Sequence, residues 1–174
     1  MSSNPSIRLG LADDKAELLA LYQAVAMEAG SLARRAEEMD ASYIEGISLA
    51  ALSRGVWLLA QDEQGLCASI HASRPQPRDF QHVLGELTIV VHPRSQGKGL
   101  GRRLFVAFMD RVRDHEPGIH RVELITRDSN VRARRIYEGL GFELEGRLRS
   151  RVRHPDGRLE DDLFYAWIRP VAAA

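Results

Sequence analysis

Three glycines at alternate positions mark the most chemically suggestive stretch of the sequence, QGKGLG at 96–101. The stretch joins the apolar run ELTIVV at 86–91 to a segment with helical spacing. Glycine permits positive φ and lets a ligand approach the main chain closely. Successive N–H groups at a helix start bind anions, and Lys98, Arg102 and Arg103 would add positive charge. The pattern predicts a phosphate or pyrophosphate cradle, with a solvated turn as the alternative interpretation.

The two familiar nucleotide motifs do not account for these glycines. An ATP-type phosphate loop requires Ser or Thr directly after its lysine, whereas Gly99 follows Lys98. The dinucleotide fingerprint G-x-G-x-x-G also fails, because Arg102 or Leu104 occupies its last glycine position in the two possible registers. Both types of nucleotide cradle are therefore disfavoured.

A second suggestive group follows one predicted strand later, in SNVRARRIYEGLGF at 129–142. Asn130 is a natural helix cap, and Gly141 is a natural helix end. Ala133 and Tyr137 share an apolar helical face, so a core tyrosine is one interpretation. A tyrosine that takes part in chemistry is the other, and the spacing alone leaves both open.

Together the two motifs resemble those of GNAT-type N-acetyltransferases. The match consists of Gln96-x-x-Gly99-x-Gly101 followed by Asn130-x-x-Ala133-x-x-x-Tyr137-x-x-x-Gly141-Phe142. The resemblance implies acetyl-CoA as acyl donor, no metal, and direct transfer to a primary amine of a small molecule or a protein N-terminus. It also implies the following cofactor-binding residues: Ile89, Val90, Val91, Gln96, Gly97, Lys98, Gly99, Leu100, Gly101, Arg102, Asn130, Ala133 and Tyr137.

Two residues are expected to move protons. Tyr137 corresponds to the family's usual general acid, which protonates the leaving thiolate. A free phenol has a pKa of about 10 and a thiol of about 8.5, so the tyrosine can donate without extensive ionisation at neutral pH. Glu86 is the best candidate for the base that accepts the amine proton, with a solvated glutamate as the alternative. His82, His92 and His120 are further candidates.

Cys67 and His71 lie four residues apart on a predicted strand, so their side chains are expected to point the same way. A nucleophile–base pair would need a third group to orient the histidine, and none is evident. A small buried thiol is the favoured interpretation, because direct transfer needs no acyl-enzyme.

Charged residues near the expected acceptor site allow more than one interpretation. Four arginines fall on one face of a predicted strand: Arg147, Arg149, Arg151 and Arg153. A solvated face or a homodimer edge is favoured for them, and contact with an acidic acceptor or RNA is the alternative. We expect the acceptor site to be framed by segment 31–52, loop 72–80 and hairpin 150–158. Four acidic residues in the first segment would suit a cationic amine, although such residues are usually solvated: Glu37, Glu38, Asp40 and Glu45.

Periodicity, caps and turns place these residues in one mixed α/β domain spanning 1–174. Apolar runs predict strands at 7–11, 55–62, 66–73, 82–93, 120–126, 142–153 and 158–168. Helical spacing predicts helices at 16–29, over parts of 33–52, from 99 and at 129–142, with Asp13 or Asp14 as the first cap and Gly30 as the first stop. The GNAT resemblance implies a central, mostly antiparallel sheet of about seven strands, splayed at its middle and flanked by about four helices.

The composition is that of an ordinary globular protein, with 44% hydrophobic residues among 174. Because 24 basic residues balance 24 acidic ones, no global field recruits nucleic acid or an anionic membrane. The single cysteine and the lack of signal-peptide features predict a cytoplasmic protein. A non-catalytic acyl-CoA sensor and an RNA- or ribosome-associated binding protein are the alternatives to an enzyme.

Overall fold

The computed structural model describes residues 4–28, 32 and 34–170. This described part contains seven strands and four α-helices, and the strands follow the hydrogen-bonded order β1-β2-β3-β4-β5-β7-β6. The mixed sheet and its helices confirm the predicted fold class. Gly30, the predicted end of the first helix, lies outside the described residues. The chain divides into two compact units, one of residues 1–73 and 88–112 and the other of residues 74–87 and 113–174.

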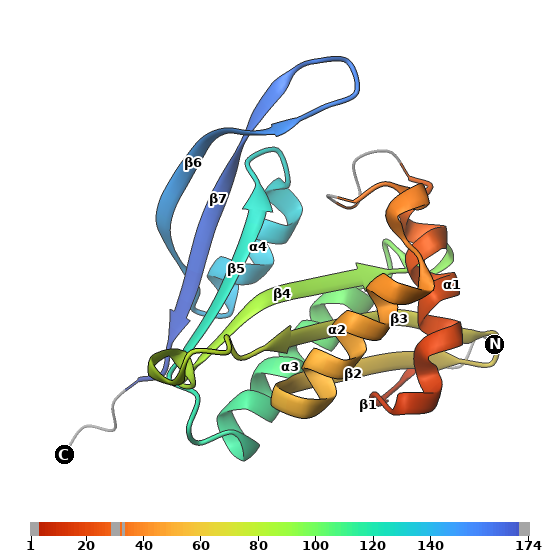
Figure 1. The fold of residues 1–174 in the computed structure, drawn as a ribbon, viewed down its shortest axis with the longest axis horizontal. Coiled ribbons are helices and arrows are strands. Elements are labelled where there is room, and N and C mark those ends of the chain that lie inside the picture. Colours follow the sequence, from red (N-terminus) through yellow and green to blue (C-terminus); the bar gives the residue numbers. More distant parts are fainter. Residues whose placement is uncertain (1–3, 29–31, 33, 171–174) are drawn as a thin grey trace. The chain divides into compact units, whose positions relative to one another are not determined.

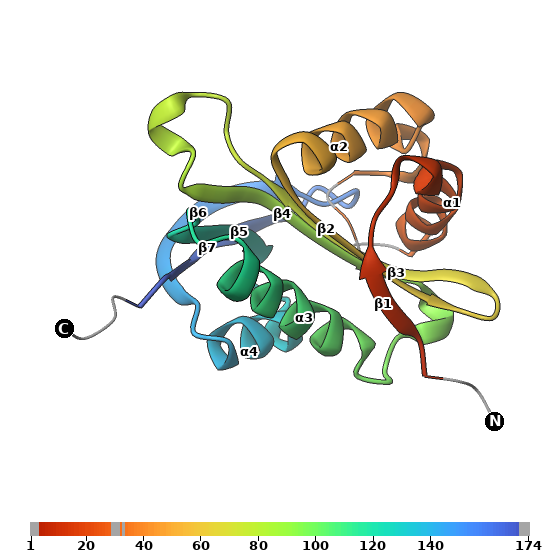
Figure 2. The same ribbon diagram turned by 90° about the horizontal axis from the view of Figure 1, so that it is seen from below.

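The first unit contains three antiparallel strands, namely β1 (Ser6–Leu9), β2 (Gly55–Asp62) and β3 (Gly65–Ser73). Its helices are α1 (Lys15–Ala26), α2 (Ala41–Arg54) and most of α3 (Leu100–His115). Helices α1 and α2 cover one face of the strands and α3 covers the other, as Figure 2 shows. The buried positions of α1 follow the predicted helical spacing: Leu18, Leu21, Tyr22 and Val25.

The second unit contains β5 (Arg121–Arg127), β6 (Glu143–Arg153), β7 (Leu159–Ile168) and the helix α4 (Val131–Gly139). Strand β7 pairs antiparallel with both β5 and β6, and β6 and β7 form a long hairpin (Figure 1). Its core includes these side chains, each 7% exposed or less: Val122, Leu124, Tyr137, Phe142, Leu163, Tyr165 and Trp167.

Strand β4 (Val83–Val91) contributes its first residues to the second unit and its last residues to the first. It runs parallel to β5, but the ladder contains only the pairs Val83–Arg121 and Leu84–Val122. A ladder this short is what the predicted splay between these strands requires.

The predicted side-chain cap of the first helix is not formed by Asp14. Asp14 precedes α1, but its side chain does not cap that helix. Its carboxylate instead accepts from the guanidinium of Arg8 at 2.6 and 2.7 Å and from the Leu11 N–H at 2.7 Å. The hydrogen bond from Arg8 is the main cause of a lowered pKa at Asp14. The ion pair with Arg8 and the bond from the Leu11 N–H therefore take the place of the predicted capping bond.

Candidate functional site

The predicted phosphate cradle lies between β4 and α3, in residues 92–99, which we name the phosphate loop. Gly97 and Gly99 have φ of 77° and 79°, a conformation that other residues adopt only at a cost. A Cβ at either position would meet nothing within 4 Å, so conformation and not crowding requires glycine. Both glycines are exposed and lead into the first turn of α3, whose N–H groups and dipole favour an anion. The loop thus has the backbone form that the sequence predicted.

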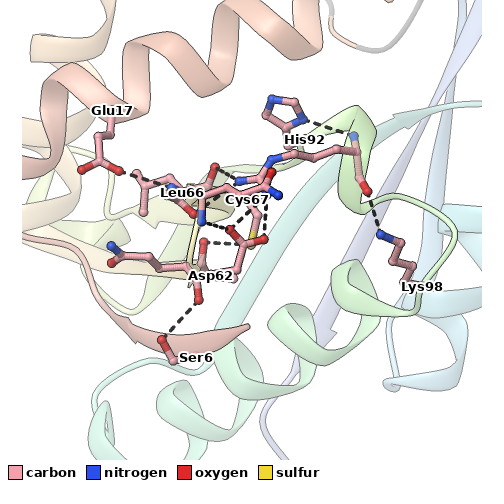
Figure 3. A network of polar contacts seen from close by, with 12 residues as sticks. Ser6, Glu17, Asp62, Leu66, Cys67, His92 and Lys98 are labelled. Carbon is pink, nitrogen blue, oxygen red and sulfur yellow. Dashed lines mark hydrogen bonds and ion pairs between the residues drawn. The ribbon is translucent and has the colours of Figure 1, made fainter. Parts of the chain in front are cut away.

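An arginine that the sequence motifs did not indicate fastens the phosphate loop to the β2–β3 hairpin. Nη1 of Arg94 donates to both carboxylate oxygens of Asp62, at 2.7 and 3.0 Å. Figure 3 shows Asp62 and Cys67 of the hairpin beside His92 and Lys98 of the loop. The N–H of His92 donates to the carbonyl of Cys67 at 2.9 Å, and Nζ of Lys98 donates to the carbonyl of Arg94 at 2.9 Å. Against the upward effect of burial, hydrogen bonds from Arg94 hold the pKa of Asp62 below its usual value.

Other polar side chains at the loop are engaged with the protein itself. Nε2 of Gln96 donates to Oε2 of Glu28 at 2.9 Å and to the carbonyl of Val91 at 3.2 Å. Arg103 donates to the carbonyl of Pro5 at 2.9 Å, so its guanidinium is engaged with the N-terminal segment. This contact leaves the charge of Arg103 in place, so its predicted contribution to the cradle stays a prediction.

In the strand before the loop, the backbone of residues 89–91 is better suited to bind a ligand than their side chains are. Val90 is 2% exposed, whereas Ile89 and Val91 are half-buried. Because alternate side chains of a strand point to opposite faces, one ligand cannot contact all three side chains but can bond their backbone. At the other end of the loop, Leu100 is buried and Arg102 is exposed in the first turn of α3.

The second motif forms the start of α4, as predicted. Oδ1 of Asn130 accepts from the N–H of Ala133 at 3.3 Å, which is the expected N-cap bond. The amide nitrogen of Asn130 carries two further donors, so capping and ligand binding are compatible. Gly141 has φ of 88° beyond the end of the helix, which explains the glycine there.

Tyr137 lies in the core of the second unit, as one of its two interpretations requires. Its side chain is 7% exposed, and its ring centroid lies 6.2 Å from those of Phe142 and Tyr165. Burial raises the pKa of Tyr137 to about 12, and a hydrogen bond with Thr126 opposes part of this effect. The phenol therefore keeps its proton at neutral pH and can act as a proton donor.

Glu86 shows a feature that the sequence pattern did not reveal. Its φ is 53°, an unusual conformation for a residue other than glycine, and its side chain is exposed. Such a backbone costs roughly 1–3 kcal/mol and is enriched at functional sites. It lies two residues beyond Leu84, the last residue of the short β4–β5 ladder. The backbone conformation of Glu86 is therefore consistent with a place in a functional site.

The structure does not bring Cys67 and His71 together as a reactive pair. Ala60 pairs with Ala68 and Gln61 with Leu66, so Cys67 is the extra residue of a bulge. Four residues of strand span about 13 Å, too far for contact. Burial raises the pKa of Cys67 and lowers that of His71 to about 4, so both groups are neutral at pH 7. The favoured interpretation, a small buried thiol, agrees with its burial.

The four arginines of β6 are exposed, and two of them, Arg147 and Arg151, have acidic partners in the same unit. Arg147 lies 2.6 Å from Asp128 and 3.0 Å from Asp161, and Arg151 lies 3.8 Å from Asp162. A register shift between Leu148 and Val152 interrupts the alternation that placed all four arginines on one face. These pairs favour a solvated face over an RNA-binding one.

The acidic residues before and within α2 have local partners. Asp40 caps α2 by accepting from the N–H of Tyr43 at 2.8 Å, and Lys15 lies 2.7 Å from Glu45. Glu38 accepts from the N–H of Arg35 at 2.8 Å, and Glu37 lies 4.0 Å from the same arginine. These contacts weaken the argument for a cationic acceptor.

The candidate histidines have structural contacts. Nδ1 of His92 accepts from the N–H of Arg94 at 3.2 Å, and burial followed by the charge of Arg94 lowers the pKa of His92. The N–H of His120 donates to the carbonyl of His82 at 2.9 Å.

In the residues that the structure describes, no three His, Cys, Asp or Glu side chains are grouped to hold a metal ion. No helix in that part of the chain is long and apolar enough to cross a bilayer.

Comparison with known proteins agrees with these motifs. The model of the acetyltransferase (GNAT) family matches residues 19–142. A mycothiol acetyltransferase of Paenarthrobacter aurescens is 36% identical over 88 residues, which is 49% of this chain and 27% of that protein. The alignment with this chain thus covers about a quarter of that relative's length.

Solved structures share the fold over almost the whole chain. A GNAT-family acetyltransferase of Streptococcus pneumoniae has a TM-score of 0.78 at 22% identity and covers 95% of this chain and 99% of its own. A phosphinothricin acetyltransferase of Sinorhizobium meliloti, solved with acetyl-CoA, has a TM-score of 0.76 at 19% identity and covers 99% of this chain and 93% of its own. At these identities the similarity establishes the fold.

Proposed function

The chain belongs to the acetyltransferase (GNAT) family, and we propose that it transfers an acetyl group from acetyl-CoA directly to a primary amine. One observation carries the proposal: exposed glycines with positive φ directly precede α3, and the first N–H groups of a helix favour an anion. The acceptor is the amine of a small molecule or of a protein N-terminus. A non-catalytic acyl-CoA sensor is the alternative.

Different residues suit different parts of acetyl-CoA. The N–H groups of 96–101 bind the pyrophosphate, with charge from Lys98 and Arg102. Backbone groups of 89–91 pair with the pantetheine arm as an added strand would. Asn130 donates from its side-chain amide to the same arm, and the small Ala133 lets the arm approach α4. The support is the family resemblance together with the local geometry of each group.

Catalysis then requires two proton transfers. The amine nitrogen attacks the thioester carbonyl and forms a C–N bond, while the C–S bond breaks. Glu86 accepts the proton that the amine loses, directly or through water. Tyr137 donates a proton to the departing sulfur, and its high pKa keeps that proton available. No acyl-enzyme is needed, which agrees with the buried and neutral state of Cys67.

We further propose a single catalytic domain that works in the cytoplasm. The family match from 19 to 142 includes residues of both compact units, which supports the single domain. Strand β6 ends the strand order, so its outer edge is where a second copy could pair in a homodimer. The acceptor site is expected near segment 31–52, loop 72–80 and hairpin 150–158.

The first test is thermal unfolding with acetyl-CoA, ATP and NAD at matched concentrations. A ligand at about 100 times its dissociation constant stabilises by roughly 2.7 kcal/mol, which raises the midpoint measurably. We expect a shift with acetyl-CoA alone. An equal shift with ATP or NAD would reject the cofactor assignment. Release of free thiol with a panel of amines and N-terminal peptides then separates an enzyme from a sensor.

A further inference from the structure

The loop that carries Asn130 is held by the β6–β7 hairpin. This loop, residues 128–130, joins β5 to α4, and we name it the Asn130 loop. The N–H of Ser129 donates to Oε1 of Glu160 at 2.8 Å, and the N–H of Asp128 donates to the carbonyl of Asp161 at 3.0 Å. Two adjacent residues of β7 therefore set the position of two adjacent residues of the loop.

The side chain of Glu160 is buried, and both of its oxygens are bonded. Although glutamates are rarely buried, its side chain is only 7% exposed. Its second oxygen, Oε2, lies 2.6 Å from Nε2 of His154 on the other side of the hairpin. Hydrogen bonds from the Ser129 side chain, and then from the Ser129 N–H and His154, lower the pKa of Glu160 to about 2. The carboxylate is thus ionised and satisfied from both sides.

Ion pairs link further residues of the hairpin, and of α4, to the Asn130 loop. Nη1 of Arg147 bridges Oδ2 of Asp128, at 2.6 Å, and Oδ2 of Asp161, at 3.0 Å. Oδ1 of Asp161 accepts from the N–H of Ser150, which has φ of 54° within the irregular part of β6. On the other side of the loop, Arg134 of α4 donates to Asp128 at 2.9 Å. The hairpin, the Asn130 loop and α4 therefore form one polar network within the second unit.

We propose that Glu160 is a positioning residue for coenzyme binding. It holds the Asn130 loop so that the amide of Asn130 is directed at the pantetheine arm. Because the Asn130 side chain is exposed and its cap bond uses only Oδ1, the loop backbone determines where its two amide donors point. The inference rests on the proposed function, since it needs coenzyme A as the ligand.

The test compares Glu160→Gln with Glu143→Gln. Glu143 is an exposed glutamate at the start of the same hairpin, outside the network just described, and serves as the matched control. Binding of coenzyme A and of its nucleotide half, adenosine 3′-phosphate 5′-diphosphate, is measured by calorimetry. The nucleotide half lacks the pantetheine arm, so it reports on the phosphate loop alone. Hydrogen exchange of the amides at 128–133 reports on the loop itself.

In Glu160→Gln we expect about tenfold weaker coenzyme A binding, an unchanged affinity for the nucleotide half, and faster exchange at 128–133. The control should match the parent protein in all three. Unchanged coenzyme A affinity would overturn the proposal, and so would equal weakening of both ligands. If the parent protein binds neither ligand, the proposed function itself fails, and this outcome is visible before any variant is made.

A second variant keeps the test valid if Glu160→Gln does not fold. Ser129→Ala removes the exposed hydroxyl that bonds Glu160 without leaving a buried group unsatisfied. It should weaken coenzyme A binding by about threefold and spare the nucleotide half. Coenzyme A affinity equal to that of the parent protein would again overturn the proposal.

Discussion

The phosphate loop and the Asn130 loop are both fastened to a β-hairpin, but the charged side chain belongs to the loop in one case and to the hairpin in the other. Each follows a strand, precedes a helix and is fastened to a β-hairpin that is distant in sequence. In the phosphate loop a cation on the loop, Arg94, reaches the carboxylate of Asp62 in the β2–β3 hairpin. In the Asn130 loop the carboxylate belongs to the hairpin, and Glu160 accepts the loop N–H of Ser129.

The difference between these loops decides which parts of each are available to a ligand. Glycine conformation shapes the phosphate loop and leaves its main chain exposed, so its N–H groups can bind an anion. In the Asn130 loop the N–H groups of Asp128 and Ser129 are already bonded by β7, so the Asn130 side chain is its available donor. One loop therefore binds through backbone and the other through a positioned side chain.

The largest effect is expected from Gly99→Val. Valine at a φ of 79° is strained and adds bulk where the main chain must meet the pyrophosphate. We expect coenzyme A affinity to fall by at least about 100-fold in calorimetry. Gly118→Val is the control, because Gly118 also has open space around it but no positive φ. Retained affinity in Gly99→Val would reject the backbone cradle.

Tyr137→Phe separates chemistry from binding in the second unit. The ring packing against Phe142 and Tyr165 is kept, and only the proton donor is lost. Turnover should fall by about 100-fold while coenzyme A affinity stays within about twofold. Because the pKa of Tyr137 is about 12, the parent protein should lose its acid only at strongly alkaline pH. A variant as fast as the parent protein would assign the acid role elsewhere.

Arg94→Lys tests the comparison of the two loops directly. Lysine keeps the charge but cannot reproduce the guanidinium contacts to Asp62. We expect coenzyme A and its nucleotide half to bind about tenfold more weakly, in contrast to the selective loss in Glu160→Gln. The exposed Arg78 provides the control, Arg78→Lys. A loss confined to coenzyme A would show that the two loops are not independent.

The smallest effect concerns stability. The folded pKa of Glu160, about 2, lies below the ordinary value of 4.5, so its ionised form stabilises the fold above pH 4.5. This contribution is lost as the pH falls toward 2. Glu160→Gln should therefore be about 1.5 kcal/mol less stable than the parent protein at pH 7, and the difference should shrink in urea unfolding near pH 3. A difference independent of pH would contradict the assigned pKa.

Much of the fold could be predicted because its signals are local. The apolar run at 55–62 is β2 residue for residue, and the helix predicted from 99 is α3, which begins at Leu100. The glycine turn and the Asn130 cap depend on backbone conformation within a few residues. Such features are visible without knowledge of distant contacts.

Irregular backbone could not be predicted in the same way. The positive φ of Glu86 and Ser150 and the bulge at Cys67 occur in runs that read as regular strands. Pairing with a neighbouring strand decides where an extra residue is accommodated, and the alternation of side chains does not contain that information. The bulge at Cys67 is therefore a feature that the expected alternation of Cys67 and His71 did not reveal.

The sequence by itself determined the order of elements, the glycine cradle, the capped helix with its tyrosine, and the family to which they point. Only the tertiary structure decided what holds these groups in place. Arg94 lies 32 residues from Asp62, and Glu160 lies 31 residues from Ser129. Such partners meet only in the folded chain, because hydrophobic burial and strand register place the two segments side by side.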